Sequence, residues 1–356
     1  MRVVICGAGT AGCVAAARLS ERPDLEVTLL EVGPHYRPGA WPAALAHSHR
    51  IIKETHDWGW LARAGASPRV VHVPRGRVVG GSSVTNGAIA LRGHPEHYDE
   101  WGAAVPGYGW ESWLPWFRAI DCGGDHGVHA LEGVGRGMQD HPKVSYRFEL
   151  QIPAPSWPAP WYQVLLTGAH EVEGERRVYQ VMPYSGQVEG GHRLTDLNVQ
   201  VADARSRRGA VRLQGRDPAL QPVLEMGWFL EPSDRAAAVA AGRRLMEVAR
   251  TPPLADVLRP YPGLDDPDHV LRTVETFHHP VGSCRMGAAD DPCAVVDAAG
   301  RVHGLEGVWV LDASAIARVP SANTHLAVIA LAERLAAAFP GDPVPAPAGA
   351  GEVTAT

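Results

Sequence analysis

Short apolar runs alternate with glycine and alanine over the first 31 residues of the chain. Residues 3–6 form a continuous apolar run, as in a strand buried in a parallel sheet, and residues 27–30 form a second one. Between them, the alanine-rich residues 13–19 are typical of a helix. Strand, helix and strand in this order predict a βαβ unit.

The middle of the chain has a different pattern, in which short alternating runs are separated by Gly, Pro and Asp. These runs predict an antiparallel sheet, and they cover residues 144–150, 177–181, 197–202 and 211–213. Downstream, Ser233 is expected to cap a helix that ends near residue 250. Residues 309–311 predict a short strand, and residues 322–338 predict the last helix. Residues 340–356 are rich in Pro and Gly and are expected to be disordered.

Composition and charge narrow the class of protein. The chain has 356 residues, enough for about two domains, with 45% hydrophobic and 20% charged residues. Its net charge of -6 gives no support for binding to nucleic acid or to an anionic membrane surface. The first strand begins at residue 2 and no apolar run is long enough to cross a bilayer. We therefore expect a soluble, cytoplasmic protein without a signal peptide.

The cysteines and histidines predict neither a disulfide framework nor a metal site. No C-x-x-C pair occurs among the five cysteines, which are expected to be reduced thiols: Cys6, Cys13, Cys122, Cys284 and Cys293. Cys284 is expected to be a small packed residue. The 17 histidines show no H-E-x-x-H spacing, and no metal is expected.

A glycine-rich turn follows the first apolar run. Gly7, Gly9 and Gly12 have the G-x-G-x-x-G spacing, which allows a tight turn and the close approach of a pyrophosphate to a helix N-terminus. Glu31 lies 19 residues past Gly12, where a carboxylate accepts hydrogen bonds from ribose hydroxyls. The pattern predicts dinucleotide binding, and by itself it does not separate FAD from NAD.

Four blocks in order along the chain resemble one known family. They are VVICGAGTAGCVAAARLSE with LLEVGP, then GRVVGGSSVTNGAIALRGHPEHYDEW, then GVGRGMQDHP, and last HPVGSCRMG through NTHLAVIALAERLA. In this combination the chain resembles the glucose-methanol-choline (GMC) oxidoreductases, which are FAD-dependent alcohol oxidases and dehydrogenases. The resemblance implies an α/β fold with a Rossmann-like FAD-binding domain and a second antiparallel-sheet (α+β) substrate domain.

The resemblance also implies domain boundaries and a second loop at the cofactor. The FAD-binding domain would comprise residues 1–142 and 276–339, the substrate domain residues 143–275, and the disordered tail residues 340–356. By resemblance, a loop after the βαβ unit touches the pyrophosphate and the isoalloxazine edge; its residues are Gly80, Gly81, Ser82, Asn86 and Gly87. Some family members tie the flavin covalently to a histidine of this loop, whereas Thr85 stands at the matching place here. Noncovalent FAD is therefore implied.

Catalytic roles are implied for two residues near the C-terminus. His279 matches the histidine of the family that takes the proton of the alcohol, and Asn323 matches the partner of the developing alkoxide. The hydride would pass to flavin N5. His278 is the nearest rival for the base, and the motif alignment favours His279. Further cofactor contacts are implied at the strand-to-helix turns, at Asp312, Ala313 and Thr324. Asp140 and His141, in QDHP, are expected to form only a structural turn.

The chain departs from the family around residues 130 and 131, where a long central block of the FAD domain is missing. That block ordinarily supplies further strands and part of the adenine-side wall. Our leading hypothesis is an FAD-dependent enzyme that oxidises the CH–OH group of a small or natural-product alcohol, with dioxygen or another carrier as electron acceptor. Two alternatives stay open: a flavin-free acid/base cyclase, isomerase or lyase on the same scaffold, and a noncatalytic binding protein.

Overall fold

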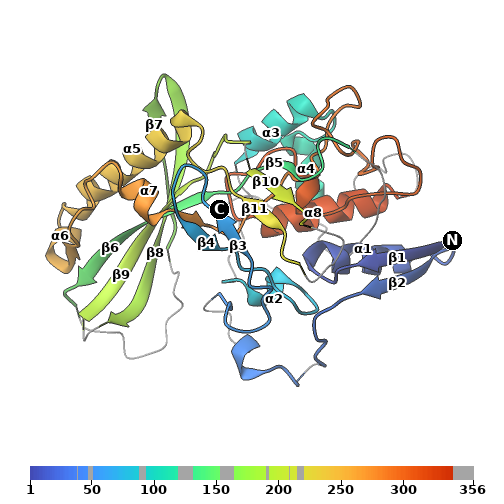
Figure 1. Ribbon diagram of the computed structural model, residues 1–356, viewed down its shortest axis with the longest axis horizontal. Helices are drawn as coiled ribbons and strands as arrows, with labels where there is room; N and C mark the ends of the chain where they lie inside the picture. The colour runs from blue at the N-terminus through green and yellow to red at the C-terminus, as the bar shows by residue number, and fades with distance from the viewer. Residues whose placement is uncertain are drawn as a thin grey trace.

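The computed structural model consists of three sheets and the helices that pack around them (Figure 1). It describes residues 1–37, 39–46, 51–87, 94–118, 131–152, 164–189, 192–207, 209–214 and 220–339. The tail prediction for residues 340–356 lies outside the described residues. In the view of Figure 1, the N-terminal strands lie at one end of the molecule and the large antiparallel sheet at the other.

The N-terminal unit forms as the apolar pattern predicts. Strands β1 (Arg2–Cys6) and β2 (Glu26–Leu30) pair in parallel, in the register Val3↔Val27, and helix α1 (Thr10–Ser20) connects them. Val3 and Ile5 are buried on the face toward α1. Helix α8 (Thr324–Ala337) packs along α1, so the first and last helices of the described chain lie side by side (Figure 1).

A five-stranded sheet occupies the centre, in the order β4-β3-β11-β10-β5. Its strands come from distant parts of the chain: β3 (Leu61–Arg63), β4 (Val70–His72), β5 (Arg136–Met138), β10 (Gly209–Arg212) and β11 (Val223–Glu225). Short helices precede β5 in the chain, namely η1 (Ala43–Leu45), α2 (Ser82–Thr85), α3 (Pro95–Ala104) and α4 (Trp110–Arg118), and α4 packs on α3 and on α8. The predicted run at residues 211–213 therefore belongs to this sheet and not to the large antiparallel one.

The large sheet has the order β12-β6-β9-β8-β7, and β13 pairs with β6. All its pairings are antiparallel, as predicted. Its strands are β6 (Pro142–Leu150), β7 (Leu166–Val172), β8 (Glu175–Glu189), β9 (His192–Val201), β12 (Leu258–Pro260) and β13 (Glu275–Thr276). Helix α5 (Pro232–Ala249) lies across one face, and α6 (Leu254–Val257) and α7 (His269–Thr273) follow it (Figure 1).

A buried ion-pair network ties α5 to this sheet. The guanidinium of Arg177 is fully buried and pairs with Asp203 at 3.0 Å and with Asp234 at 2.6 Å. Asp234 also accepts hydrogen bonds from the backbone N–H groups of Arg205 and Ser206. Because every partner is buried, removing one carboxylate would break an ion pair and leave buried hydrogen-bond donors without an acceptor.

Two local predictions are wrong. Helix α5 begins at Pro232, which occupies a first-turn position, so Ser233 lies inside the helix and does not cap it. Residues 309–311 form no strand, because Trp309 makes only an isolated bridge to Arg301. The buried side chains gather mainly in two clusters, one around the large sheet and one around α1 and α8. The domain boundaries inferred from the sequence remain a prediction.

Candidate functional site

One open cleft, with a volume of about 860 Å³, joins most of the predicted site residues. Its wall includes the predicted glycines of the first turn, part of the second loop, both candidate catalytic residues and the C-terminal turn: Gly7, Gly9, Gly12, Gly81, Ser82, Asn86, Gly87, His279, Asp312, Ala313, Asn323 and Thr324. Glu31 and Gly80 do not line it. A cleft of this size lies within the usual range for cofactor and small-molecule sites.

The first glycine turn leaves space that a ligand could fill. A Cβ atom built on Gly7 or Gly9 would meet no other atom within 4 Å, and both residues face the cleft. A Cβ on Gly12 would instead lie 1.7 Å from the carbonyl oxygen of Gly7, so this glycine allows the turn and α1 to pack together. No side chain caps the N-terminus of α1. Unpaired N–H groups at a helix N-terminus favour an anion such as a diphosphate.

Glu31 holds the backbone of this turn. Its carboxylate accepts hydrogen bonds from the N–H groups of Ala8 at 2.8 Å and Gly33 at 2.7 Å. The carboxylate therefore links the end of β2 to the glycine turn. A ribose hydroxyl would have to share oxygens that already accept these two bonds.

The second glycine loop packs directly on the first. The N–H of Gly80 donates to the carbonyl of Ala8 at 2.6 Å. A Cβ on Gly81 would lie 2.8 Å from the Cα of Gly9, so only glycine fits this approach. Gly80 and Gly81 have φ angles of 96° and 56°, in the region that favours glycine. Gly80 therefore supports the loop from behind, and Gly81 brings it to the cleft.

His279 lies in the loop after β13, and its side chain is 7% exposed. Its backbone N–H donates to Asp140 Oδ1 at 2.8 Å, and Asp140 Oδ2 accepts from the Thr276 hydroxyl at 2.7 Å. Its ring Nδ1 lies 2.8 Å from Nδ1 of His141. The sequence predicts only a structural turn at Asp140 and His141. This prediction is incomplete, because both residues contact His279 directly.

His278 also lines the cleft, so both adjacent histidines border the same cavity. His278 has a φ of 71°, an uncommon value for a residue with a side chain, and its N–H donates to the Thr276 hydroxyl. Only His279 is held through both its backbone and its ring by the Asp140–His141 pair. This support distinguishes it from its neighbour.

Asn323 stands at the N-terminus of α8 and is 8% exposed. Asparagine at this position usually accepts a hydrogen bond from its own helix, but here the side chain makes no such bond. Its Oδ1 is buried without a hydrogen-bond partner. An unpaired buried oxygen in a cleft wall is costly unless a ligand supplies a donor. Thr324, the first residue of α8, lines the cleft beside it.

Asp312 and Ala313 form a tight turn at the cleft wall. Asp312 caps the short helix η2 (Ala313–Ala315) by accepting from the Ser314 N–H at 2.8 Å. The carbonyl of Ala313 accepts from the Gly282 N–H. Asp312 therefore acts as a turn former and also borders the cleft, where its carboxylate is exposed.

Burial sets the protonation of the groups around His279. It lowers the pKa of His279 well below the usual range, and His141, His278 and Arg75 add to this by repulsion. Burial also lowers the pKa of His141 to about 3 and raises the pKa of Asp140 to about 6. At neutral pH both imidazoles are therefore neutral, and the lone pair of His279 is available to a proton.

The cleft wall near His279 and His278 carries positive charge. Arg75 and Lys143 line it, and the only carboxylate in the described wall belongs to Asp312. Lys143 pairs with Glu275 at 2.8 Å, and Arg75 donates to the carbonyl of Pro74. The acidic partners of these two cations, Glu275 for Lys143 and Asp57 and Asp140 for Arg75, do not line the cleft, so the wall itself presents the cations.

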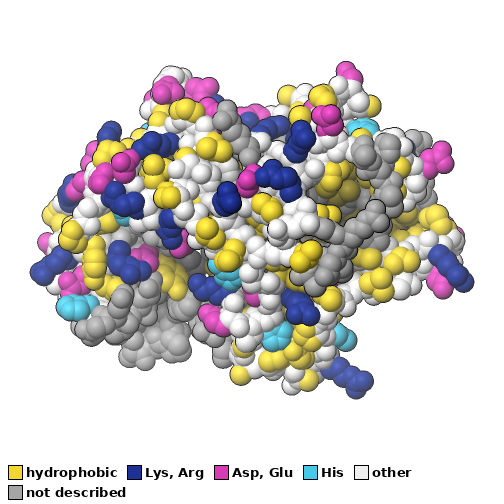
Figure 2. Space-filling view, viewed as in Figure 1, with side chains coloured by type: hydrophobic (Ala, Val, Ile, Leu, Met, Phe, Trp, Pro, Cys, Tyr) yellow, Lys and Arg dark blue, Asp and Glu magenta, His cyan; other side chains and the backbone are white. Residues whose placement is uncertain are grey.

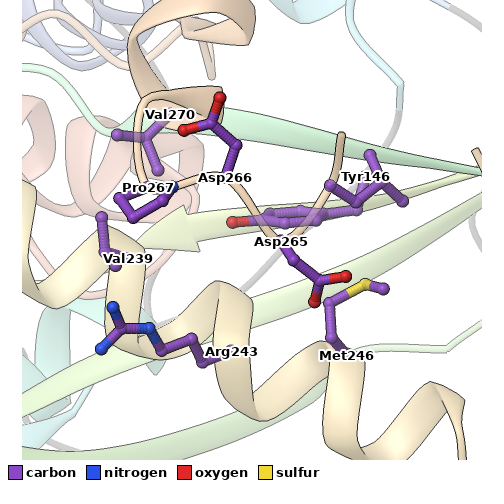
Figure 3. Close-up of a pocket in the computed structure, with 9 residues that line it drawn as sticks. Tyr146, Val239, Arg243, Met246, Asp265, Asp266, Pro267 and Val270 are labelled. Carbon is purple, nitrogen blue, oxygen red and sulfur yellow. The ribbon is translucent and has the colours of Figure 1, made fainter. Parts of the chain in front are cut away.

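We also searched the described residues for metal-binding groups, membrane-spanning helices, disulfides and further cavities. Among the described residues no group of three or more His, Cys, Asp or Glu could hold a metal, and no helix there is long and apolar enough to span a bilayer. The described cysteines form no disulfide, Cys284 lines the cleft, and Cys122 lies outside the described residues. A small hollow of about 20 Å³ beside Tyr146 and Asp265 has room only for about one water (Figure 3).

Sequence comparison identifies the family. Family models described as GMC oxidoreductase match residues 1–210 and 204–332. Oxygen-dependent choline dehydrogenase 1 of Chromohalobacter salexigens is 25% identical over 540 aligned positions, covering 96% of this chain and 95% of the relative. Since this chain has only 356 residues, the relative carries segments without a counterpart here. Choline oxidase of Arthrobacter globiformis is 31% identical over 235 residues, which are 60% of this chain and only 43% of that relative.

Solved structures show the same fold. A pyridoxine 4-oxidase from Mesorbium loti superposes with a TM-score of 0.80 at 20% identity, over 94% of this chain and 98% of the other. A formate oxidase superposes with a TM-score of 0.78 at 16% identity, over 94% and 96% of the two chains. These likenesses confirm the α/β class with an antiparallel sheet. With family models that together match residues 1–332, the chain belongs to the GMC oxidoreductases, a family of FAD-binding enzymes.

Proposed function

We propose that this protein is an FAD-dependent oxidoreductase that oxidises the CH–OH group of a small alcohol. The observation that carries the proposal is the continuity of the cleft. Its wall runs from the open space at Gly7 and Gly9 to the buried imidazole of His279 and the unpaired oxygen of Asn323. A cofactor held at one end can thus meet an alcohol held at the other.

The residues present fit FAD. The space at Gly7 and Gly9 and the uncapped N-terminus of α1 would suit a diphosphate, and the loop at Gly81, packed against Gly9, would border the same space. The N-terminus of α8, at Asn323, points its partial positive charge toward the same cleft. When bound, the flavin supplies the hydride acceptor. Thr85 is buried at the place where some family members attach the flavin to a histidine, and this supports noncovalent binding.

His279 and Asn323 would have different roles toward the alcohol. His279 is neutral at neutral pH and takes up the hydroxyl proton. Asn323 lines the same cleft, and its side-chain Nδ2 group donates a hydrogen bond to the substrate oxygen as that oxygen loses its proton to His279. Both residues are less than a tenth exposed, so their hydrogen bonds act in a site with little competing water.

Charge in the cleft favours a neutral or anionic alcohol. Two of the relatives above are named for choline, a quaternary ammonium alcohol. Here Arg75 and Lys143 line the substrate end, and the guanidinium of Arg77 lies over the ring of Trp58 at 5.4 Å. A cationic head group such as that of choline would be repelled by this wall. Dioxygen or another carrier serves as electron acceptor, as proposed from the sequence.

The test begins with FAD binding, followed by anaerobic reduction of the bound flavin by a panel of alcohols. His279→Ala should slow flavin reduction by roughly 10²- to 10⁴-fold. His192→Ala, at an exposed histidine paired with Glu149, is the matched control and should change nothing. Choline should reduce the flavin more slowly than its uncharged carbon isostere, in which a tert-butyl group replaces the trimethylammonium group. Failure to bind FAD would reject the proposal, and faster reduction by choline would reject the charge argument.

One observation favours a second candidate, a flavin-free acid/base enzyme. In the described part of the chain only β1 and β2 form the parallel sheet beside the glycine turn. A cofactor domain reduced in this way could lose its cofactor and keep the histidine cleft. Purified protein that is colourless, binds no added FAD and still depends on His279 for a cyclase, isomerase or lyase activity would support this candidate.

A further inference from the structure

We propose that His141 is a positioning residue that fixes the ring tautomer of His279, so that Nε2 of His279 is the atom that accepts the proton. The proposal rests on the function proposed above for His279. Its structural basis is a buried pair of imidazoles, with the two Nδ1 atoms 2.8 Å apart and the rings perpendicular. His141 is 0% exposed and His279 is 7% exposed.

Two backbone carbonyls act as acceptors for the ring of His141, those of Ala202 and Pro320, and they determine where its proton lies. Nε2 of His141 is 3.2 Å from the backbone carbonyl oxygen of Ala202. A carbonyl oxygen can only accept, so Nε2 of His141 carries the hydrogen. Burial keeps this imidazole neutral at neutral pH, with a pKa of about 3. Its Nδ1 is therefore a lone-pair acceptor.

The same reasoning passes to His279. A hydrogen bond between the two Nδ1 atoms needs one hydrogen, and His141 does not supply it. The Nδ1 of His279 must donate, so the lone pair of neutral His279 lies on Nε2. No atom in the described part of the chain makes a hydrogen bond to that Nε2, and the residue lines the cleft. Nε2 is thus the open base.

Proton transfer from the alcohol completes the arrangement. The O–H bond of the substrate breaks, Nε2 of His279 gains the proton, and the ring becomes cationic. His141 still accepts from Nδ1 of that cation through its lone pair, which strengthens the bond because one partner is now charged. His141 itself gains and loses no proton. It never contacts the substrate, so its effect passes entirely through the orientation and charge of His279.

Asp140 has a separate part in the same support. It accepts from the backbone N–H of His279, whereas His141 contacts the ring. Consecutive residues before β6 therefore fix the main chain and the side chain of His279 independently. If His141 merely filled space, an apolar ring of similar size would replace it without altering the tautomer.

The first experiment measures the tautomer directly, by ¹⁵N NMR of histidine-labelled, FAD-free protein at neutral pH, with the His279 signals assigned from His279→Gln. We expect Nδ1-protonated His279 in the unsubstituted protein. His141→Phe should abolish that preference. His141→Gln should keep it, because its amide oxygen can accept from His279 while its NH₂ group donates to Ala202. His269→Phe is the control, since His269 is a buried histidine bonded to the Ser145 carbonyl outside the cleft.

The second experiment measures flavin reduction. His141→Phe should lower the rate by roughly 10- to 100-fold with little change in KM, and His141→Gln should restore most of it. A His279 protonated on Nε2, or one whose tautomer is the same in His141→Phe, would overturn the proposal. If the protein binds no FAD, the proposed function fails, while the NMR result still decides the role of His141. Should His141→Phe not fold, an altered tautomer in folded His141→Gln would also overturn it.

Discussion

Replacing Gly9 by alanine should weaken FAD binding and leave the fold intact. Gly9 has φ −74° and ψ −172°, which alanine adopts without strain, and its added Cβ would meet no protein atom within 4 Å. Alanine is a poorer N-cap residue than glycine, which destabilises the folded protein by up to about 1 kcal/mol. Alanine also lowers the entropy of the unfolded chain, which stabilises the folded protein by a similar amount. The free energy of unfolding of the FAD-free protein should therefore change little.

The magnitude follows from the space that the methyl group takes. It would project into the cleft where we place the diphosphate, which needs close approach to the backbone. Forcing one extra carbon into a packed site costs typically about 1 to 3 kcal/mol. At about 1.4 kcal/mol for each factor of ten, FAD should bind roughly 5- to 150-fold more weakly.

Gly12→Ala gives the contrasting control. Its Cβ would lie 1.7 Å from the Gly7 carbonyl oxygen, so the turn and α1 would have to move apart. We expect a lower melting temperature for this variant, measured by circular dichroism without FAD, and an unchanged one for Gly9→Ala. The Kd for FAD is measured by quenching of flavin fluorescence. An unchanged Kd in a folded Gly9→Ala variant would refute the placement of the diphosphate.

Three further outcomes follow from the described contacts. Glu31→Gln replaces a charged acceptor of two backbone N–H groups, which should cost about 1.5 to 3 kcal/mol and weaken FAD binding, as thermal unfolding and titration would show. Asp234→Ala leaves Arg177 partly uncompensated and should destabilise the protein by about 3 to 5 kcal/mol in urea unfolding, without changing the Kd for FAD of the folded protein. Acid should also destabilise the fold, because burial lowers the pKa of His97 to about 4 and that of His141 to about 3. The unfolded chain binds those protons first, so each histidine should remove up to about 1.4 kcal/mol per pH unit below about pH 6.5, and an unfolding midpoint that does not fall on acidification would contradict this.

Sequence patterns predicted the elements whose causes are local. The two apolar runs at residues 3–6 and 27–30 are confirmed as strands β1 and β2 and the alanine-rich segment as helix α1, because these elements pair and pack with near neighbours in the sequence, although no residue of β2 is buried. The apolar run at residues 309–311 has the same appearance and forms no strand. A strand needs a partner along its edge, and the run itself carries no information about that partner.

The assembly of the site could not be read from the residues alone. Gly9 and Asn323 line one cleft although more than three hundred positions separate them, and only the family resemblance united them beforehand. The contact between His141 and His279 joins residues 138 positions apart. A dipeptide such as Asp140–His141 is compatible with a turn anywhere. The antiparallel bridge between Gln139 and Val281, together with the pairing of β13 with β6, brings the two histidines together.

The reduced parallel sheet changes how the cofactor turn must be supported. Parallel strands are usually covered on both faces, yet Val4 and Leu30 are each 48% exposed on the face away from α1, and apolar side chains gather over this end in Figure 2. Longer relatives have segments that this chain lacks. Here the turn is held instead by the Glu31 carboxylate, by Gly80 bonded to the Ala8 carbonyl, and by α8 against α1. Because Asn323 stands at the N-terminus of α8, the helix that packs against the glycine turn also positions Asn323, so in the proposed function cofactor binding and alcohol oxidation depend on the same packing.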